Sequence, residues 1–515
     1  MSRFIEGFKA PAFPVSGKAM AIGLAVLGLV LPLLIYLVLP VLGVSGLADA
    51  LGYKRLILLA GAGIGAIVYW QYWRFVIPRP QVLLGFVLLA WPVVAFLNAM
   101  LLELGINLRL TPLLLLTLML PMLWVSAKNY ALIFSQLPWL KYYLIFFSWL
   151  TLYFIFYNAH ATDPQLSGGD NALSDGAVST VQLISYLYCL LSITVSAVAI
   201  LKARNFRGLF DFLNQALLWV SGLEALFTII GFPFKLTSLM LDGFDRAIGI
   251  FSHPNPFAHH MGIVMIYLLG LYCYYQGERK QRMPAWLIWG SIGFNFLAFM
   301  LGLSKTALGT FALCALTLFL MNLAVPAVRR GFAKILIGLV VVLPLGLLAF
   351  QLLSGKNFFG MLDSRMNETE SFDWRTMIWE DLMSQIHWGS VWLGHGFTAA
   401  NQMVFNLTFN DAKNANPLMM VHNAYIALLY DLGLMGYFMF VAAISLALQS
   451  LRGWMSAIRP ALRTEHSIII ALTLYFLLVC GFDEMSYMFD APQLYWLLVS
   501  LLFCMTVRER RALPA

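Results

Sequence analysis

The chain has 515 residues, of which 61% are hydrophobic and only 11% are charged, and its mean hydropathy is +0.82. A soluble protein would carry about 25% charged residues, so this composition excludes a soluble globular enzyme. The formal net charge of +8 does not indicate a nucleic-acid partner, because the positions of the basic residues are explained better by membrane topology.

Apolar runs of about 20 residues, the length that a helix needs to cross the hydrocarbon core, recur from one end of the chain to the other. We therefore expect an all-α, polytopic integral membrane protein with 14 transmembrane helices. The alternating pattern of a transmembrane barrel is not seen in the sequence. The expected spans centre near residues 31, 66, 93, 118, 149, 190, 220, 266, 294, 317, 344, 435, 476 and 499.

The distribution of charge gives the expected orientation. With the N-terminus in the cytoplasm and spans alternating, the cytoplasmic segments hold 22 of the 32 basic residues, whereas the opposite side holds 17 of the 24 acidic residues. Cytoplasmic loops are enriched in Lys and Arg, so we expect both termini to be cytoplasmic.

This topology divides the chain into four parts. We expect an N-terminal transmembrane bundle of about six spans at 1–208 and core spans at 209–354, with an external loop at 233–260. A large external loop subdomain follows at 355–421, and C-terminal spans occupy 422–515.

The external subdomain contains an amphipathic segment, Ser371–Trp388, which predicts a helix lying at the membrane surface, with Asp373 as its N-cap. Its apolar residues recur at helical spacing. They are Trp374, Met377, Ile378, Leu382 and Ile386. Arg375 and Trp379 fall on other faces, and the Arg375 guanidinium suits either a surface salt bridge or two-pronged contact with a phosphate.

Two more cations are expected on the external side. Arg246 precedes the eighth span and is a candidate either for an ion pair with Asp242 or Asp245 or for ligand binding. Lys305 lies at the short junction between the ninth and tenth spans, beside the hydroxyl of Ser304. Its ammonium group suits phosphate binding, and the alternative is a lysine that reaches back to the interface.

His422 and Asn423 open the twelfth span, where an imidazole can take a proton from an attacking hydroxyl, unless this histidine is structural. Glu224 and Asp431 lie inside spans, where acids are costly and therefore mark either function or tight pairing. A proton path and a structural hydrogen bond both fit these two acids.

His253, His259 and His260 invite a metal site. Adjacent histidines point to different faces of a helix, however, and no carboxylate follows the pair at helical spacing. The spacing therefore predicts no metal site.

The order of these elements resembles the bacterial O-antigen ligase and Wzy-type O-antigen (exopolysaccharide) polymerase family. The matching motifs are Arg246–Gly249 before the span entry Pro254–Ala258, the Ser304–Lys305 junction, Arg375–Trp379, Gly394–Phe397 (GHGF) and His422–Leu428. The resemblance covers about residues 230 to 440, and the first 200 residues match only as generic spans.

The resemblance implies an inverting, metal-independent glycosyltransferase of the GT-C type that needs no cofactor. Such an enzyme moves a glycan from undecaprenyl pyrophosphate to an acceptor hydroxyl at the periplasmic face of the bacterial inner membrane. Carried over by residue, His422 is the base or acceptor-activating histidine, Arg375, Lys305 and Arg246 contact the pyrophosphate, and the supporting residues are Asn423, Ser304, Trp379, Glu224 and Asp431. Lys305 stands where the family commonly has an arginine, a departure that keeps the charge but loses the planar guanidinium fork.

The expected partners are the lipid-linked glycan donor, a glycan or lipid A-core acceptor, the bilayer, and a chain-length regulator as a possible partner, with no nucleic acid. The 14 spans and the extra N-terminal region favour a polymerase, and a ligase that delivers glycan to lipid A-core is the alternative. A polyprenyl-glycan flippase or transporter is an alternative of another class. Glu224 and Asp431 favour a transporter, whereas the external clustering of cations and the absence of a repeated half oppose it.

Overall fold

The computed structural model describes residues 71–88, 110–157, 175–241, 244–249, 251, 253–277, 283–323, 328–329, 348, 351, 360, 363, 370–397, 399–401, 403–404, 421–457, 459–483 and 490–512. The chain divides into two compact units, Met1–Leu83 and Leu84–Ala515. In the first unit the described residues begin at 71 and are mostly helical. All the elements below belong to the second unit.

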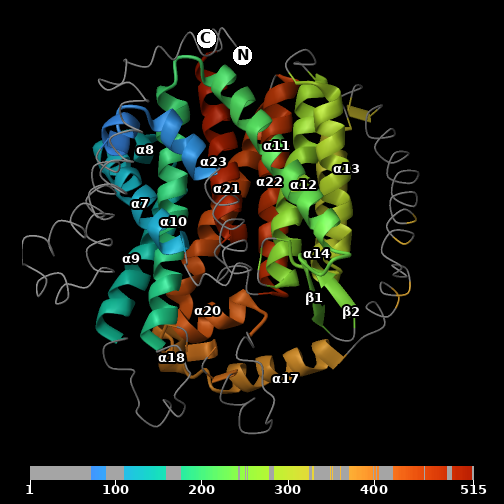
Figure 1. The fold of residues 1–515 in the computed structure, drawn as a ribbon. Coiled ribbons are helices and arrows are strands. Elements are labelled where there is room, and N and C mark those ends of the chain that lie inside the picture. Colours follow the sequence, from blue (N-terminus) through green and yellow to red (C-terminus); the bar gives the residue numbers. More distant parts are fainter. Residues whose placement is uncertain are drawn as a thin grey trace, which may run out of the picture. The chain divides into compact units, whose positions relative to one another are not determined.

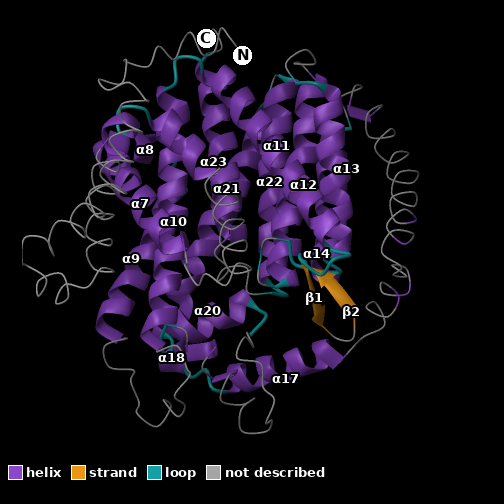
Figure 2. Cartoon of the chain, in the orientation of Figure 1, coloured by secondary structure: helices purple, strands orange, loops and turns teal. Residues whose placement is uncertain are grey.

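The second unit contains a bundle of long helices (Figures 1 and 2). Its first helices are α7 (Leu110–Lys128), α8 (Tyr130–Gln136), α9 (Leu140–Tyr157), α10 (Asp175–Lys202), α11 (Phe206–Gly231), α12 (Pro254–Gly277), α13 (Ala285–Leu301) and α14 (Lys305–Asn322). Later in the chain come α17 (Glu370–Ser384), α18 (Trp388–Leu393), α20 (Ala424–Leu432), the 3₁₀ turn η2 (Gly433–Tyr437), α21 (Phe438–Ser456), α22 (Pro460–Cys480) and α23 (Asp490–Arg511).

The helices agree with the expected spans wherever the structure describes the chain. Seven stretches are long and apolar enough to cross a membrane, counting α20 to α21 as one, and three shorter apolar helices coincide with the spans expected near 118, 149 and 294. The spans expected near 31, 66, 93 and 344 lie outside the described residues. The twelfth expected span is not one continuous helix, because η2 interrupts it at Gly433.

Among the described residues, a two-stranded antiparallel hairpin is the exception to the all-α expectation. It consists of β1 (Ser238–Leu241) and β2 (Phe244–Ala247), and it pairs Leu239 with Arg246. The hairpin lies at the same end of the bundle as α17 and α20 (Figure 1), which we call the hairpin end. The opposite end, which we call the basic end, is where α10 and α23 finish at Lys202 and Arg511.

Helix α12 runs through the middle of the bundle. Its apolar window, Pro254–Tyr275, is completely buried, and it packs against α13, α14, α22 and α23. A Cβ at Gly262 would overlap the Tyr475 side chain of α22, so a glycine is needed for this close approach. The packing places the start of α12 beside the residues that follow α22.

Most of the amphipathic segment forms α17, with Ile378 and Leu382 buried and Met377 exposed, but the helix ends at Ser384 and Trp388 begins the separate helix α18. The helix begins at Glu370, three residues before the expected cap. Asp373 therefore lies inside the first turn, where its carbonyl accepts a hydrogen bond from the Thr376 hydroxyl. The N-cap prediction was wrong because the helix continues upstream through Glu370.

Candidate active site

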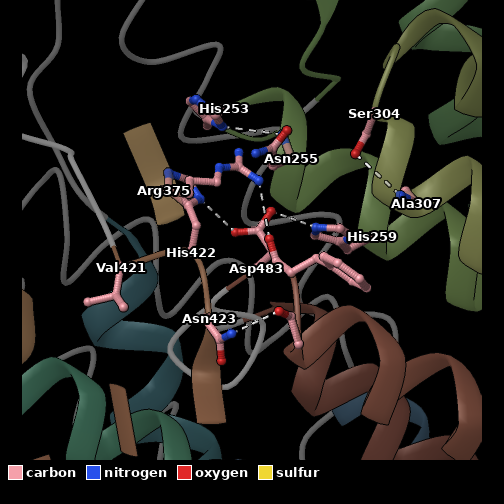
Figure 3. Close-up of polar contacts among 12 residues, drawn as sticks. His253, Asn255, His259, Ser304, Ala307, Arg375, Val421, His422, Asn423 and Asp483 are labelled. Atoms are coloured by element: carbon pink, nitrogen blue, oxygen red, sulfur yellow. Dashed lines mark hydrogen bonds and ion pairs between the residues drawn. The ribbon is translucent and has the colours of Figure 1, made fainter. Parts of the chain in front are cut away.

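A buried carboxylate, Asp483, lies at the centre of the polar cluster at the hairpin end (Figure 3). It follows the last turn of α22, and its backbone N–H donates to the carbonyl of Val479. His259 Nε2, from the start of α12, lies 2.8 Å from Asp483 Oδ2, and His422 Nδ1 lies 3.1 Å from Asp483 Oδ1. One carboxylate thus holds two imidazoles from distant parts of the chain.

The charge state of Asp483 fixes the roles of these nitrogens. Burial alone would raise the pKa of this carboxyl, but hydrogen bonds from His259 and His422 hold it well below its usual range. An ionised carboxylate only accepts hydrogen bonds, so His259 Nε2 and His422 Nδ1 both carry protons. With Nδ1 protonated, Nε2 is the nitrogen of a neutral His422 ring that can accept a proton.

The backbone around His422 is held in an unusual conformation. His422 has φ of +55°, in the left-handed region that non-glycine residues seldom occupy. Asn423 fixes the start of α20, because its side-chain oxygen accepts from the N–H groups of Tyr425 and Ile426 and its Nδ2 donates to the Gly481 carbonyl. Such backbone outliers concentrate at functional sites, where the surrounding structure maintains them.

Helix α17 contributes the exposed side of the cluster. Arg375 Nη1 donates to the carbonyl of Phe482, the residue before Asp483, over 3.3 Å. Trp379 Nε1 donates to the Val421 carbonyl over 2.7 Å, and the Trp374 ring meets the His422 ring edge to face at 6.4 Å. The expected convergence of Arg375 and His422 is therefore present, and Trp379 ties α17 to the residue before His422.

Arg246 is a buried cation that joins the hairpin to the bundle. Its Nε donates to the Gly302 carbonyl at the α13–α14 junction and its Nη2 donates to Asn255 Oδ1 at the start of α12. Both of these acceptors are neutral groups. The Ser304 hydroxyl caps α14 by accepting from Ala307 N–H, and Lys305 is the first residue of that helix, at the same junction that Arg246 contacts.

Asp431 is built into the scaffold. Its Oδ1 accepts from the backbone N–H of Ala400 at 2.7 Å, and its carbonyl accepts from Gly396 N–H. The GHGF segment approaches so closely that a Cβ at Gly394, whose φ is +76°, would overlap the Asp431 carbonyl. Of the two roles that the sequence left open for this acid, the structure shows a hydrogen bond, which the Asp431 side chain accepts from the Ala400 N–H.

Glu224 lies apart, between helices in the interior of the bundle. Its Oε2 is 3.4 Å from His260 Nε2, and both side chains are buried. They line a cavity of about 40 Å³ together with Gln493. His260 and His259 thus point to different carboxylates, as their adjacent positions on one helix require.

The sequence therefore identified one part of the cluster and missed another. It identified His422, Arg375 and Arg246, and it placed Lys305 at the α13–α14 junction that Arg246 contacts. It missed Asp483 altogether and considered His259 only as a metal ligand. The available signal for Asp483 was an acid just beyond the external end of an apolar span, but acids are common on that side. Among the described residues, no three His, Cys, Asp or Glu side chains form a group that could hold a metal ion.

Comparison with known proteins bears on this cluster directly. Residues 292–441 match the family model described as O-antigen ligase, and no curated protein matches the chain. The matched range contains Lys305, Arg375 and His422, whereas His259 and Asp483 lie outside it. The match confirms the resemblance that the motifs indicated: residues 292–441 are a domain of the O-antigen ligase and Wzy-type polymerase family.

Proposed function

We propose that the protein is a membrane glycosyltransferase that moves a glycan from a polyprenyl-pyrophosphate donor to a sugar hydroxyl at the hairpin end of the bundle. The family match supports an O-antigen ligase or polymerase type of membrane enzyme, and the apolar helices support a multi-pass protein of the bacterial inner membrane. The observation that carries the proposal is the His422 ring, whose Nδ1 lies 3.1 Å from Oδ1 of the buried Asp483 carboxylate.

In the proposed reaction, the acceptor hydroxyl gives its proton to His422 Nε2 while its oxygen attacks the anomeric carbon of the donor. The bond between that carbon and the pyrophosphate oxygen breaks, and its electron pair leaves with the lipid diphosphate. Attack opposite the leaving group inverts the configuration in one step. The imidazolium formed on His422 is stabilised by the ionised Asp483, the arrangement that orients the histidine in hydrolase triads.

Cations would stabilise the departing diphosphate. Arg375 is the foremost candidate, because it is only partly buried and already lies beside Phe482 and Asp483. A guanidinium forms bidentate hydrogen bonds to two phosphate oxygens. Stabilisation of the negative charge that develops in the transition state is often the largest catalytic contribution. Lys305 and the buried Arg246 add positive charge at the α13–α14 junction.

The proposal includes an orientation in the membrane. The described helix ends at the basic end carry Lys202, Arg207, Arg452 and Arg511, which fits a cytoplasmic face. The hairpin end would then face the periplasm, where a polyprenyl-linked donor and its acceptor meet. Labelling of a single cysteine placed at Met377, exposed on α17, with an impermeant maleimide in intact spheroplasts tests this orientation.

We propose polymerase activity, with ligation to lipid A-core as the alternative. The test incubates the purified protein in nanodiscs with lipid-linked repeat units, with and without lipid A-core, and separates the products by gel electrophoresis. A ladder of lengthened lipid-linked glycans without lipid A-core supports the polymerase. Product that forms only when lipid A-core is present supports the ligase.

Transfer in neither reaction, with donor movement between leaflets of the same nanodiscs, would instead support the flippase alternative. His422→Ala is the control in all reactions, because its products must disappear if His422 is the base. Products that persist in this variant contradict the mechanism.

A further inference from the structure

A second polar cavity lies at the basic end of the bundle, on the opposite side from Asp483. It has a volume of about 250 Å³ and lies between α21, α22 and α23. Its lining consists of Gln449, Arg452, Gly453, Ser456, His466, Phe503, Thr506, Val507 and Arg510. The glycan-transfer mechanism uses none of these residues.

The lining has the chemistry of an anion site. Arg452 and Arg510 are both exposed at the cavity, and its lining as described contains two guanidinium groups and no carboxylate. The nearby acid Glu509 is engaged elsewhere, because Arg207 binds both of its oxygens. The positive charge of the two arginines is therefore not neutralised by an acid within the cavity lining.

His466 gives Arg510 a fixed position. The histidine is 1% exposed, and its Nε2 accepts a hydrogen bond from Arg510 Nη2 at 3.1 Å. An arginine has five N–H donors, so most remain for a ligand. The proton of this neutral histidine must lie on Nδ1, which is buried and has no hydrogen-bond partner among the described residues.

Gly453 keeps this space open. A Cβ at this position would overlap His466 Nε2 and the Arg510 guanidinium. Phe503 and Val507 provide an apolar wall. A volume of about 250 Å³ is several times that of one water molecule and is sufficient for a phosphate group with its adjoining carbons.

We infer that this cavity binds a phosphate group, either the headgroup of an anionic phospholipid or a free phosphate-containing anion. Arg452 and Arg510, with the Gln449 amide beside them, can bind a phosphate group, because guanidinium groups form bidentate hydrogen bonds to phosphate oxygens. The apolar wall suits the glycerol portion of a lipid. Basic residues that flank membrane helices at the cytoplasmic face attract anionic lipids.

The test uses the full chain in nanodiscs of phosphatidylcholine, with or without phosphatidylglycerol, and with inorganic phosphate as a separate probe. Native mass spectrometry measures retained phosphatidylglycerol, and a thermal scan measures Tm. The variant is Arg452→Gln with Arg510→Gln. Its matched control is Arg204→Gln with Arg459→Gln, which removes two exposed arginines outside the cavity lining.

We expect phosphatidylglycerol to raise the Tm of the wild type and of the control, and the cavity variant to retain at least about tenfold less of this lipid. A rise in Tm caused by inorganic phosphate in pure phosphatidylcholine identifies a free anion as the ligand. A rise caused by phosphatidylglycerol alone identifies a lipid headgroup.

The inference is overturned if neither probe affects the wild type, or if the control loses as much lipid as the cavity variant. Arg452→Gln alone covers the case in which loss of the Arg510 contact with His466 impairs folding, because the Arg452 side chain makes no hydrogen bond or ion pair within the described residues. We expect that single variant to lose about fivefold in lipid retention. Equal retention by the single variant and the wild type also counts against the site.

Discussion

Asp483 and Asp431 are both buried carboxylates at the hairpin end, yet their partners differ. Asp431 accepts a hydrogen bond from a backbone N–H of a neighbouring segment, whereas Asp483 accepts from two imidazoles. Burial alone therefore does not identify a catalytic carboxylate in a membrane protein. The hydrogen-bond partner of the carboxylate is the better indicator of a catalytic role, because a histidine can change its protonation state during a reaction and a peptide N–H cannot.

The largest expected effect on the Asp483 side comes from His422→Ala. Removing the general base should lower kcat for glycan transfer by about 10³-fold with little change in donor binding. Single-turnover rates and donor affinity in nanodiscs measure the two quantities separately. Transfer within about threefold of wild type would remove His422 from the mechanism.

Asp483→Asn should have the next largest effect. The amide can donate to His422 Nδ1, which would move the imidazole proton to Nε2 and remove the base. We expect kcat to fall by about 10²-fold while the folded protein persists. The pH profile of kcat distinguishes this from simple misfolding: a wrong tautomer changes its shape, and a smaller folded fraction changes only its height.

On the Asp431 side, the expected effect is on stability. Asp431→Ala leaves the buried N–H of Ala400 without its acceptor and should lower the free energy of unfolding by about 2 kcal/mol. Asp431→Asn keeps an acceptor oxygen and should be nearly neutral. Thermal scans compare the two variants. If Asp431→Ala lowers kcat per folded molecule and leaves Tm unchanged, Asp431 has a catalytic role and the contrast with Asp483 is wrong.

Arg375→Ala has the smallest expected effect, about a tenfold loss of donor affinity, because other cations remain near the α13–α14 junction. Arg375→Lys should recover only part of this loss, since an ammonium lacks the planar fork. Titration of an inactive His422→Ala background with the lipid-linked donor measures affinity without turnover. Unchanged affinity in this background would exclude a pyrophosphate contact by Arg375.

The sequence predicted the parts of the fold that depend on local properties. Span length, amphipathic spacing and charge bias indicated the helices, and motif order led to His422 and Arg375 before any tertiary contact was known. It could not predict that His259 meets Asp483, because 224 residues separate them and the contact depends on how α12 packs against α22. The hairpin was missed for a related reason: four-residue strands carry too little periodicity to be recognised.

The hydrogen bond from Trp379 to the Val421 carbonyl has a mechanical consequence. Helix α17 carries Arg375, and Val421 immediately precedes His422, so the phosphate-binding candidate and the base are linked through one indole N–H. A displacement of α17 that breaks the Arg375 contact would also pull on the strained backbone at His422. Under the proposed mechanism, contact of Arg375 with the donor and activation of the acceptor by His422 would therefore be coupled through α17.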